Sequence, residues 1–330
     1  MSNTQVKLKS KPEGNPNTDN FEVIAANTPV PADGEILCKT LYLSLDPYMR
    51  GQISGRHISG TINPGDLMRG ECVGEVIDPN GADFKIGDKI TFHGGWQKYF
   101  TAPASDVKPV DSRLEPASLA LGIMGMPGLT AYAGVFYLGE LKETDTVLVS
   151  AASGAVGSMV GQMALNLGCR VIGIAGSDEK CGWLHDTAGF HGTINYKTEE
   201  LADAIRRECP NGVDYYFDNV GGDMLDTVMQ QLAIGARVVL CGLMAQYNTD
   251  VIPPGPNPAT IIKARATVRG LVVYDFFDKI QEFLDYAIPL LDSDKIKYTE
   301  DVSDGLDQAP EAFARLMNGK NFGKTIIKVS

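Results

Sequence analysis

The stretch of sequence that decides the fold is Val147-Leu148-Val149-Ser150-Ala151-Ala152-Ser153-Gly154-Ala155-Val156-Gly157-Ser158. Its first three residues are apolar and predict a buried strand, and the residues from Val156 to Leu167 have the length and composition of a helix. Gly154 lets a backbone approach a pyrophosphate, and Gly157 lets the helix pack closely on the strand. Because a helix N-terminus offers unpaired N–H groups and a positive dipole end, the stretch predicts a dinucleotide site.

The glycine pattern of this loop departs from the commonest fingerprint, because Ala152 stands at the first glycine position. A glycine-rich turn alone also fits a tight connection, so the surrounding pattern has to decide. The strands expected here are Thr146–Ser150, Arg170–Ile174, Thr193–Asn195, Val213–Phe217, Ala236–Cys241 and Val268–Val273. The helices expected are Val156–Leu167, Asp178–Ala188, Glu199–Glu208, Asp223–Leu232 and Asp275–Leu291. This alternation predicts a parallel sheet with helices on both faces, an α/β fold.

The residues before this region have a different texture, with short β-runs separated by turn residues, and they predict an all-β domain. Examples of the runs are Phe21–Ala26, Glu35–Leu43, Cys72–Ile77 and Lys89–Phe92. Helical segments follow at Pro116–Gly122 and Leu129–Leu138, and the tail, Ala309–Met317 then Thr325–Val329, predicts a helix and a strand that returns to the first domain. We therefore expect two domains, residues 1–118 joined by residues 299–330, and residues 119–298.

The strand Arg170–Ile174 bears on which dinucleotide is bound. An NAD-specific site usually has an acidic residue at the end of this strand, for the ribose hydroxyls, but Gly176-Ser177 follows here. Small residues leave room for a 2′-phosphate, Lys180 can supply charge, and Tyr196 can hydrogen-bond the same group. The alternatives to these binding roles are that Lys180 is a solvent-exposed lysine on a helix and that the ring of Tyr196 only packs against the protein. The acidic residues Asp178 and Glu179 argue against a phosphate here, although both also fit the first turn of a helix. Taken together, the pattern favours NADPH over NADH.

The composition limits the partners. The chain has 330 residues, with 29 basic and 41 acidic residues and a net charge of −12, which disfavours a nucleic acid or an anionic membrane surface. Its six cysteines contain no CxxC pair, as expected for reduced thiols. The segment from Met1 to Gly14 is polar, and no apolar run is long enough for a bilayer, so a cytoplasmic protein is expected.

Several sequence blocks together resemble one family, the zinc-independent medium-chain dehydrogenase/reductases. Within it, the chain resembles the branch of the leukotriene/prostaglandin reductases, plant double-bond reductases and bacterial curcumin reductases, over essentially its whole length. Besides the phosphate loop, the blocks are Ser44–Arg50, Met126–Tyr132, Gly176–Cys181, Ile194–Lys197, Tyr216–Gly222, Gln246–Asn248 and Asn321–Lys324. Their order and spacing make the resemblance specific.

The resemblance implies a GroES-like β domain that takes part in substrate binding, a doubly wound Rossmann domain that binds NADPH, and a homodimer with Val268–Val273 as the candidate edge strand. It implies pyrophosphate contacts from the phosphate loop, 2′-phosphate contacts from Lys180 and Tyr196, and nicotinamide contacts from Leu271–Val273 and Asn321. The full set of expected cofactor-binding residues is Gly154, Ala155, Val156, Gly157, Ser158, Lys180, Tyr196, Asn219, Cys241, Gly242, Tyr247, Leu271, Val272, Val273 and Asn321.

The sequence predicts no metal site. The zinc alcohol dehydrogenases of this superfamily have a Gly-His-Glu block near Gly70-Glu71-Cys72 and a lobe of four cysteines, and neither is present. Without these ligands there is no zinc to act as a Lewis acid on a carbonyl oxygen, as simple alcohol and ketone chemistry requires. Reduction of a conjugated C=C bond depends less on such a Lewis acid. The resemblance therefore implies an NADPH-dependent alkenal or enone reductase, in which hydride reaches the β-carbon and negative charge gathers on the carbonyl oxygen.

Two tyrosines are the candidate donors to that oxygen, because a phenol stays protonated near neutral pH. Tyr247 follows the strand Ala236–Cys241 at the carboxyl end of the expected sheet, where ligands gather. Tyr48 belongs to the first domain, and for this residue core packing in the Asp46-Pro47-Tyr48 turn remains an equal alternative. Arg50 and Arg69 are expected to have structural roles.

Two other hypotheses remain open. The zinc-free scaffold also supports quinone reduction, and a non-catalytic NADPH-binding protein of the crystallin type is the third hypothesis. The segments Gly51–Asn63 and Tyr247–Pro258 are expected to shape the substrate pocket, and Leu243–Asn257 reads as one long loop. The sequence does not identify the physiological substrate.

Overall fold

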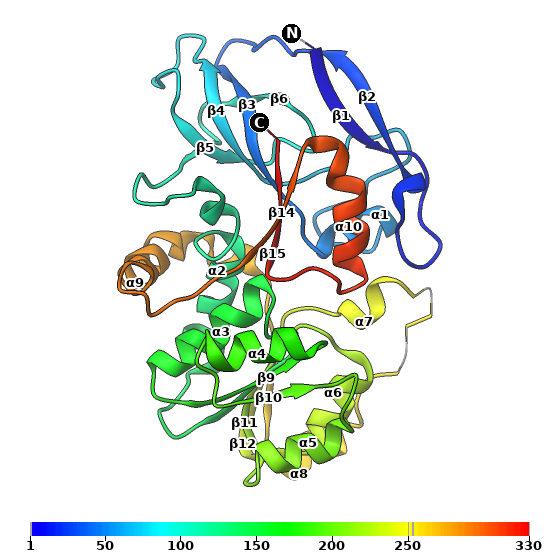
Figure 1. Ribbon diagram of the computed structural model, residues 1–330, viewed down its shortest axis with the longest axis vertical. Coiled ribbons are helices and arrows are strands. Elements are labelled where there is room, and N and C mark those ends of the chain that lie inside the picture. The colour runs from blue at the N-terminus through cyan, green and yellow to red at the C-terminus, as the bar shows by residue number, and fades with distance from the viewer. Residues whose placement is uncertain (1, 250, 253, 330) are drawn as a thin grey trace. The chain divides into compact units, whose positions relative to one another are not determined.

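The computed structural model describes residues 2–249, 251–252 and 254–329 (Figure 1). Two compact units make up the chain, Met1–Gly122 with Glu300–Ser330 and Ile123–Thr299. The boundaries expected from the sequence were 118/119 and 298/299, whereas the contacts place them at 122/123 and 299/300.

The first unit is built mainly of antiparallel strands. The main sheet has the order β14-β15-β3-β4-β5-β7, with β6 paired to β3, and β1 and β2 form a separate pair. Its strands are β1 Ser2–Leu8, β2 Phe21–Asn27, β3 Glu35–Ser44, β4 Cys72–Asp78, β5 Lys89–Phe92, β6 Tyr99–Pro103, β7 Lys108–Pro109, β14 Glu300–Asp304 and β15 Lys324–Lys328. Its helices are α1 Tyr48–Ser54 and α10 Ala309–Met317, with 3-10 turns at Thr18–Asn20, Ala117–Leu121 and Leu306–Gln308. β15 pairs with β3 antiparallel, which confirms the predicted return of the last strand.

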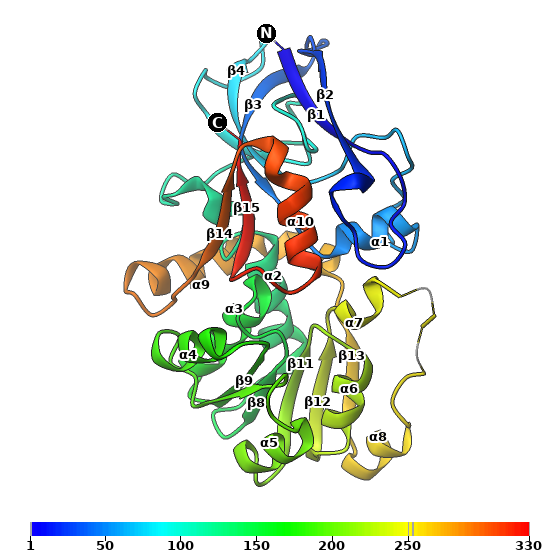
Figure 2. The same cartoon turned by 45° about the vertical axis from the view of Figure 1, so that its right-hand side comes forward.

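The core of the first unit is centred on aromatic rings from distant segments. Trp96 is fully buried and lies 5.7 Å from Phe21 and 5.8 Å from Phe313, measured between ring centroids. Phe313 belongs to α10, which both ribbon views show beside β15 (Figures 1 and 2). Such aromatic pairs add about 1 kcal/mol each beyond their buried area, so they help to fix the C-terminal helix on the β domain.

The second unit is a doubly wound parallel sheet, as the sequence predicts. Its strand order is β10-β9-β8-β11-β12-β13, and every neighbouring pair is parallel. The strands are β8 Thr146–Val149, β9 Arg170–Ala175, β10 Gly192–Asn195, β11 Val213–Asp218, β12 Leu232–Leu240 and β13 Thr267–Gly270. The helices are α2 Met126–Tyr132, α3 Ala155–Asn166, α4 Asp178–Asp186, α5 Leu201–Glu208, α6 Gly222–Met229, α7 Met244–Tyr247, α8 Ala259–Ala264 and α9 Ile280–Asp292. The strand order reverses between β8 and β11, and ligands of such sheets bind outside the carboxyl ends of the strands at this point.

Alternation along the strands explains how both faces of the sheet are covered. Ile172 and Ile174 of β9 belong to a buried cluster with Ile205 of α5 and Val228 of α6. Gly173 faces the other way, because a Cβ atom there would lie 3.0 Å from Leu184 of α4. Figure 2 shows α3 and α4 on one side of the sheet and α5 and α6 on the other. Helices therefore leave only the strand ends and the sheet edges for other partners.

Two predicted boundaries are wrong because the pairing of distant strands decides them. The helix expected over Asp223–Leu232 ends at Met229, and Leu232 begins β12 opposite Val213 of β11. The strand expected over Val268–Val273 ends at Gly270, which pairs with Leu240, the last residue of β12. Leu271 donates one more hydrogen bond to the carbonyl of Leu240, at 2.9 Å, and Val273–Lys279 then forms a 3-10 helix.

Three further expectations also need correction. The helix expected over Leu129–Leu138 is α2 followed by a π-helical turn at Ala133–Gly139, where a Cβ on Gly134 would lie 2.3 Å from the ring of Phe217. The close approach of this turn to β11 therefore interrupts the regular helix. The helix expected over Asp275–Leu291 is divided into the 3-10 helix and α9, and the long loop from Leu243 contains α7. Residues 250 and 253 of that loop lie outside the described residues.

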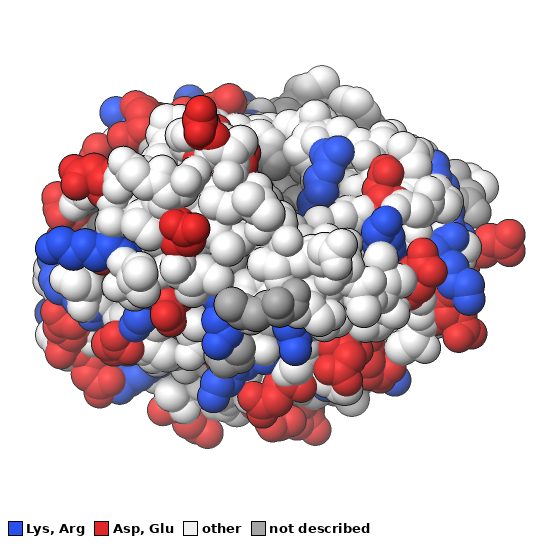
Figure 3. Space-filling model, turned by 90° about the horizontal axis from the view of Figure 1, so that it is seen from above, with Lys and Arg blue, Asp and Glu red and all other residues white. Residues whose placement is uncertain are grey.

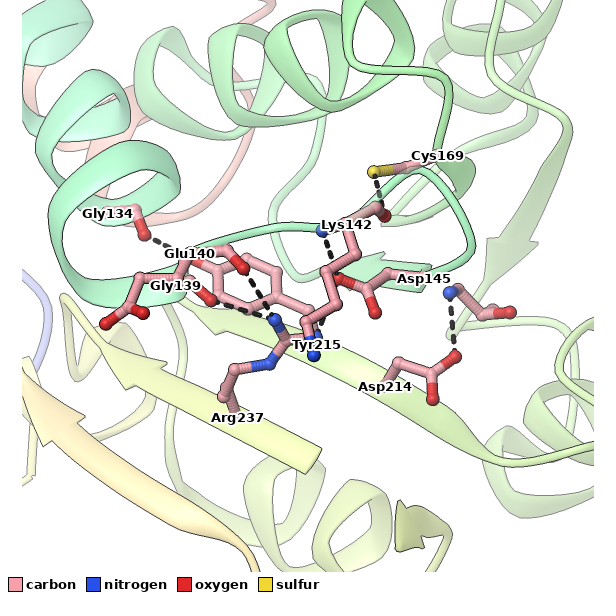
Figure 4. Close-up of polar contacts among 10 residues, drawn as sticks. Gly134, Gly139, Glu140, Lys142, Asp145, Cys169, Asp214, Tyr215 and Arg237 are labelled. Carbon is pink, nitrogen blue, oxygen red and sulfur yellow. Dashed lines mark hydrogen bonds and ion pairs between the residues drawn. The ribbon is translucent and has the colours of Figure 1, made fainter. Parts of the chain in front are cut away.

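A cluster of polar side chains lies at the end of the sheet where the strands begin (Figure 4). Asp145 lies just before β8 and forms an ion pair of 2.6 Å with Arg237 of β12. The same guanidinium donates to the carbonyls of Gly139 and Glu140, at 3.1 and 2.8 Å. The hydroxyl of Tyr215 donates to the carbonyl of Gly134 at 2.8 Å. The polar groups in this cluster are satisfied by partners from the unit itself, so it has a structural role.

Candidate functional site

The phosphate loop lies where β8 ends and α3 begins, at the reversal of the strand order. Gly154 is the N-cap residue of α3, with extended backbone angles of −79° and 172°, and the described structure has no side-chain cap or acidic residue in the first turn. The first N–H groups of a helix have no partner within it, so those of α3 remain for a ligand. A Cβ on Gly157 would lie 2.5 Å from the carbonyl oxygen of Ala151, which explains why glycine is needed there.

The residue with the left-handed backbone in this loop lies one position before Ala152, which stands at the first glycine position of the fingerprint. Ala151, and not Ala152, has a positive φ, of 47°. Ala152 is fully buried, and its N–H donates to the carbonyl of Ile174 at 3.0 Å, which ties the loop to β9. A left-handed conformation costs an alanine about 1 kcal/mol, and this strain lies beside the open helix N-terminus.

The end of β9 lies against the end of β10 and forms the expected 2′-phosphate region. A Cβ on Gly176 would lie 3.2 Å from the hydroxyl of Tyr196 and 3.3 Å from Cε of Lys197. The ammonium of Lys197 lies 6.0 Å from the centroid of the Tyr196 ring. The sequence analysis did not include Lys197 among the site residues. The available signal was its place next to Tyr196, in the turn that follows β10.

The first residues of α4, the helix that follows β9, make several contacts with the protein beside this region. The hydroxyl of Ser177 accepts from the N–H of Lys180 at 3.3 Å, so Ser177 caps α4. The carboxylate of Asp178 accepts from the amide of Asn195 at 2.6 Å. Lys180 is half-buried in the first turn of α4. The acidic pair that argued against a phosphate is therefore partly occupied by protein contacts.

The end of β11 is bound to the end of β8 by a buried polar network. The amide of Asn219 donates to the carbonyl of Ser150 at 2.7 Å, and the hydroxyl of Ser150 donates to Asp218 at 3.0 Å. The carboxylate of Asp218 also accepts from Tyr216 and from the N–H groups of Val220 and Gly221. Burial raises the pKa of Asp218, while these hydrogen bonds lower it. Sequence reasoning found Asn219 but missed Asp218, which holds the Asn219–Gly221 turn.

Cys241, Gly242 and Tyr247 follow β12 on the adjacent segment. The N–H groups of Cys241 and Gly242 donate to the carbonyl of Asp218 at 2.8 and 3.1 Å, so this segment lies against the Asn219 turn. Burial raises the pKa of the Cys241 thiol to about 12, which keeps it protonated. Tyr247 ends α7, and burial raises its pKa while a backbone hydrogen bond from Leu243 lowers it. Its phenol remains a donor at neutral pH.

The three residues expected near the nicotinamide in this unit have different environments. Leu271 is buried, and a Cβ on Gly134 would lie 3.3 Å from its side chain. Val272 is 40% exposed, and Val273 begins the 3-10 helix. Because these residues lie beyond the last pair of β13, their side chains do not follow strand alternation.

Tyr48 and Asn321 belong to the first unit. Tyr48 begins α1 and is half-buried, and its ring lies 5.1 Å from that of His57. The amide of Asn321 donates to the carbonyl of Gly323 at 2.9 Å. Arg50 is buried and donates to the carbonyls of Pro12 and Gly14, while Arg69 donates to those of Ser59 and Thr61. These contacts of the two arginines agree with the expected structural roles.

The described residues contain neither a candidate metal site nor a helix suited to a membrane. Within residues 2–249, 251–252 and 254–329, no group of three or more His, Cys, Asp or Glu side chains could hold a metal ion. In the same part of the chain, no helix is long and apolar enough to cross a membrane. On the face seen in Figure 3, acidic and basic side chains are interspersed.

The parallel sheet with its phosphate loop defines a class, the dinucleotide-dependent oxidoreductases with a separate β domain. Family models agree: residues 4–110 match the model described as N-terminal domain of oxidoreductase, and residues 155–292 match the model described as zinc-binding dehydrogenase. Both match regions lie in the unit expected for them.

Individual relatives show to which branch of this class the chain is most similar. It is 38% identical to the NADPH-dependent curcumin reductase of Escherichia coli (strain K12), over 98% of this chain and 96% of the relative. It is also 38% identical to the NADP(+)-dependent 2-alkenal reductase of Nicotiana tabacum, over 100% and 98% of the two chains. The crystal structure of CurA in complex with NADPH from Vibrio vulnificus matches with a TM-score of 0.94 and 40% identity, over 99% of each chain. The chain belongs to the medium-chain dehydrogenase/reductase family, in its zinc-independent double-bond reductase branch.

Proposed function

We propose that this protein is an NADPH-dependent reductase of the C=C bond in α,β-unsaturated aldehydes and ketones. The observation that carries the proposal is the open N-terminus of α3 at the strand-order reversal, in a chain whose full-length relatives are named as NADPH-dependent or NADP-dependent reductases. The relatives' names support the reaction class, and the phosphate loop supports the cofactor.

The side chains described above fit NADPH. The N–H groups at the start of α3, Ala155 to Ser158, would hold the pyrophosphate next to Gly154. Lys180 and Tyr196 would hold the 2′-phosphate, and we add Lys197 because of its position beside Tyr196. Asn219, Cys241 and Gly242 would line the cofactor, and Leu271, Val272, Val273 and Asn321 would lie near the nicotinamide.

Bound NADPH supplies the hydride that adds to the β-carbon of the substrate. Negative charge then develops on the substrate carbonyl oxygen, and a nearby hydrogen-bond donor stabilises it. Tyr247 is the proposed donor, because burial raises the pKa of its phenol and keeps the proton on the oxygen. Tyr48 is the second candidate, and a proton finally reaches the α-carbon.

The proposal extends to assembly and location. In the described part of the sheet, β13 is the terminal strand and pairs with β12 alone, so its outer edge can pair with a second copy. We propose a homodimer formed there, and sedimentation equilibrium tests it. The six cysteines are free, which fits a reducing compartment such as the cytoplasm.

NADPH consumption with a panel of enals, enones, quinones and saturated aldehydes tests the proposed reaction. Turnover of enals and enones, with the saturated carbonyl compound as product, is expected. Faster turnover of quinones would support the quinone reductase hypothesis, and binding of NADPH without turnover of any electrophile would support a non-catalytic protein.

A further inference from the structure

Lys324 and Asp46 form a buried ion pair in the first unit that the proposed mechanism does not use. The ammonium lies 2.6 Å from one carboxylate oxygen of Asp46, and the two side chains are only 4% and 8% exposed. Lys324 also donates to the carbonyl of Leu45 at 2.9 Å. The hydroxyl of Ser44 donates to the second carboxylate oxygen. Each charge is therefore held by several contacts at one place.

The pair joins two segments that carry proposed functional residues. Asp46 lies two residues before Tyr48, and its carbonyl accepts from the N–H of Met49 at 3.1 Å, in the first turn of α1. Lys324 begins β15 and lies three residues after Asn321, whose amide is bound to Gly323. The ion pair thus connects the turn that contains Asp46 and leads into Tyr48 with the turn that contains Asn321 and leads into Lys324.

Stability of the sheet does not require this pair. β15 and β3 are already joined by their ladder, and the N–H of Leu45 donates to the carbonyl of Thr325 at 3.2 Å. Desolvation of two charges offsets much of their attraction, so an apolar pair of similar volume often stabilises a fold equally well. What an ion pair adds is a defined geometry of the backbone segments that carry it.

Two more carboxyl groups, those of Glu71 and Glu300, face the pair. Burial, followed by the charge of Asp46, raises the pKa of Glu71 to about 7, while Lys324 and Lys108 lower it. His93 also faces Asp46; burial lowers the pKa of this imidazole and Asp46 raises it. Glu300, which lies opposite Lys324 in the β14–β15 pair, also faces the ammonium: burial raises the pKa of Glu300, and Lys324 lowers it. Below pH 7 Glu71 is mainly uncharged. Experiments at pH 6 therefore remove most of the charge of Glu71 from the surroundings of the Asp46–Lys324 pair.

We propose that Asp46 and Lys324 are positioning residues for the reduction, which hold the Tyr48 turn and the Asn321 turn in the arrangement that turnover requires. The inference rests on the proposed function, and specifically on a role for Tyr48. Neither residue touches the substrate in this account; they act through Tyr48.

The test compares wild type, Asp46→Asn, Lys324→Met and the double variant Asp46→Asn/Lys324→Met at pH 6. Each single variant leaves an uncompensated buried group and lowers Tm, and the double variant recovers most of that Tm. The expected kcat of the double variant for an enone is still about tenfold below wild type, while its Kd for NADPH changes less than twofold. Wild-type kcat in the double variant would overturn the proposal.

A cycle with Tyr48→Phe shows whether the pair acts through that residue. Adding the double variant to Tyr48→Phe is expected to lower kcat less than twofold further, whereas an independent tenfold loss would contradict the proposal. The matched control is Asp145→Asn/Arg237→Met, which removes the part-buried pair of the second unit and should leave kcat unchanged. If the double variant does not fold, Ser44→Ala decides, since it removes one contact of Asp46: kcat about threefold lower supports the proposal, and unchanged kcat contradicts it.

These outcomes are distinct from failure of the proposed function. If wild type does not reduce enones at all, the proposed function fails. If wild type is active and the double variant retains wild-type kcat, only the positioning role fails.

Discussion

The two ends of the parallel sheet in the second unit differ in how their polar groups are satisfied. Where the strands begin, Asp145, Arg237 and Tyr215 find their partners within the unit (Figure 4). Where the strands end, α3 begins with no side-chain cap in the described structure, next to an alanine with positive φ. The end where the strands begin therefore stabilises the fold. At the other end, the N–H groups that start α3 have no side-chain cap among the described residues, and a strained residue lies beside them, as is common at ligand sites.

Whether a polar group has a partner within the protein therefore distinguishes a structural role from a functional one, even where no ligand is bound. Asp218 and Asn219 show that the strand-end side is not simply unsatisfied: their side chains hold the loops around the phosphate site. The groups left for a ligand are backbone N–H groups at the start of α3 and side chains around Gly176. Variants at the two ends should thus affect different measurements, stability at one and cofactor binding or turnover at the other.

The largest effect is expected for Arg237→Met at the strand-start end. Asp145, whose side chain is 7% exposed, would lose its guanidinium partner, and breaking a buried pair in this way costs about 3–4 kcal/mol of unfolding free energy. Urea unfolding measures this loss, and Arg206→Met, which breaks an exposed pair with Asp203, serves as the control with an effect of about 0.5 kcal/mol. A change in the Kd for NADPH greater than twofold would contradict the separation of the two ends.

Gly157→Ala should disrupt the strand-end side. The added Cβ would lie 2.5 Å from the carbonyl oxygen of Ala151, so the start of α3 must move. Its N–H groups would then no longer point at the pyrophosphate. Loss of two charge-assisted hydrogen bonds lowers NADPH affinity by about two hundredfold. Gly182→Ala is the matched control, because the nearest atom to its Cβ would be at 3.9 Å. Fluorescence titration with NADPH measures both, and equal affinities would remove Gly157 from the site.

Tyr247→Phe should separate chemistry from cofactor binding at the same end of the sheet. Loss of the proposed donor lowers kcat for an enone by about a hundredfold. The Kd for NADPH should change less than twofold, because the ring remains. Steady-state kinetics beside Tyr48→Phe compares the two candidates, and an unchanged kcat for Tyr247→Phe would exclude it as the donor.

Lys180→Ala and Lys197→Ala should each reduce the preference for NADPH over NADH by about tenfold, the value of one hydrogen bond to a charged group. NADH affinity should remain nearly constant, because the 2′-phosphate is the only difference between the two cofactors. Lys263→Ala on α8 is the control, an exposed lysine on another helix. If the preference is retained in both site variants, the 2′-phosphate region has been assigned to the wrong residues.

The sequence predicts the parts of this site that depend on local residue types. Gly154 and Gly157 follow a buried apolar strand, and this local order predicts the phosphate loop once the strand–helix alternation around it is considered. Lys197 could not be found in this way, since it matters only once β10 is known to lie beside β9. The missed role of Asp218 has a similar cause, because its partners come from β8, β11 and the following turn.

The fold was predictable to a similar extent. The apolar run from Val268 to Val273 has a uniform β texture, but β13 ends at Gly270 because its partner β12 ends at Leu240. Likewise, Leu232 continues a helical pattern in sequence and is taken into β12 by its pairing with Val213. Element types follow from local pattern, whereas these ends follow from contacts between distant residues.

The central claim is that this protein delivers hydride to a C=C bond. The most direct measurement uses NADPH deuterated at nicotinamide C4 with an enone substrate, followed by NMR of the product. Deuterium is expected on the β-carbon of a saturated ketone. Deuterium on the former carbonyl carbon, in an allylic alcohol, would contradict it.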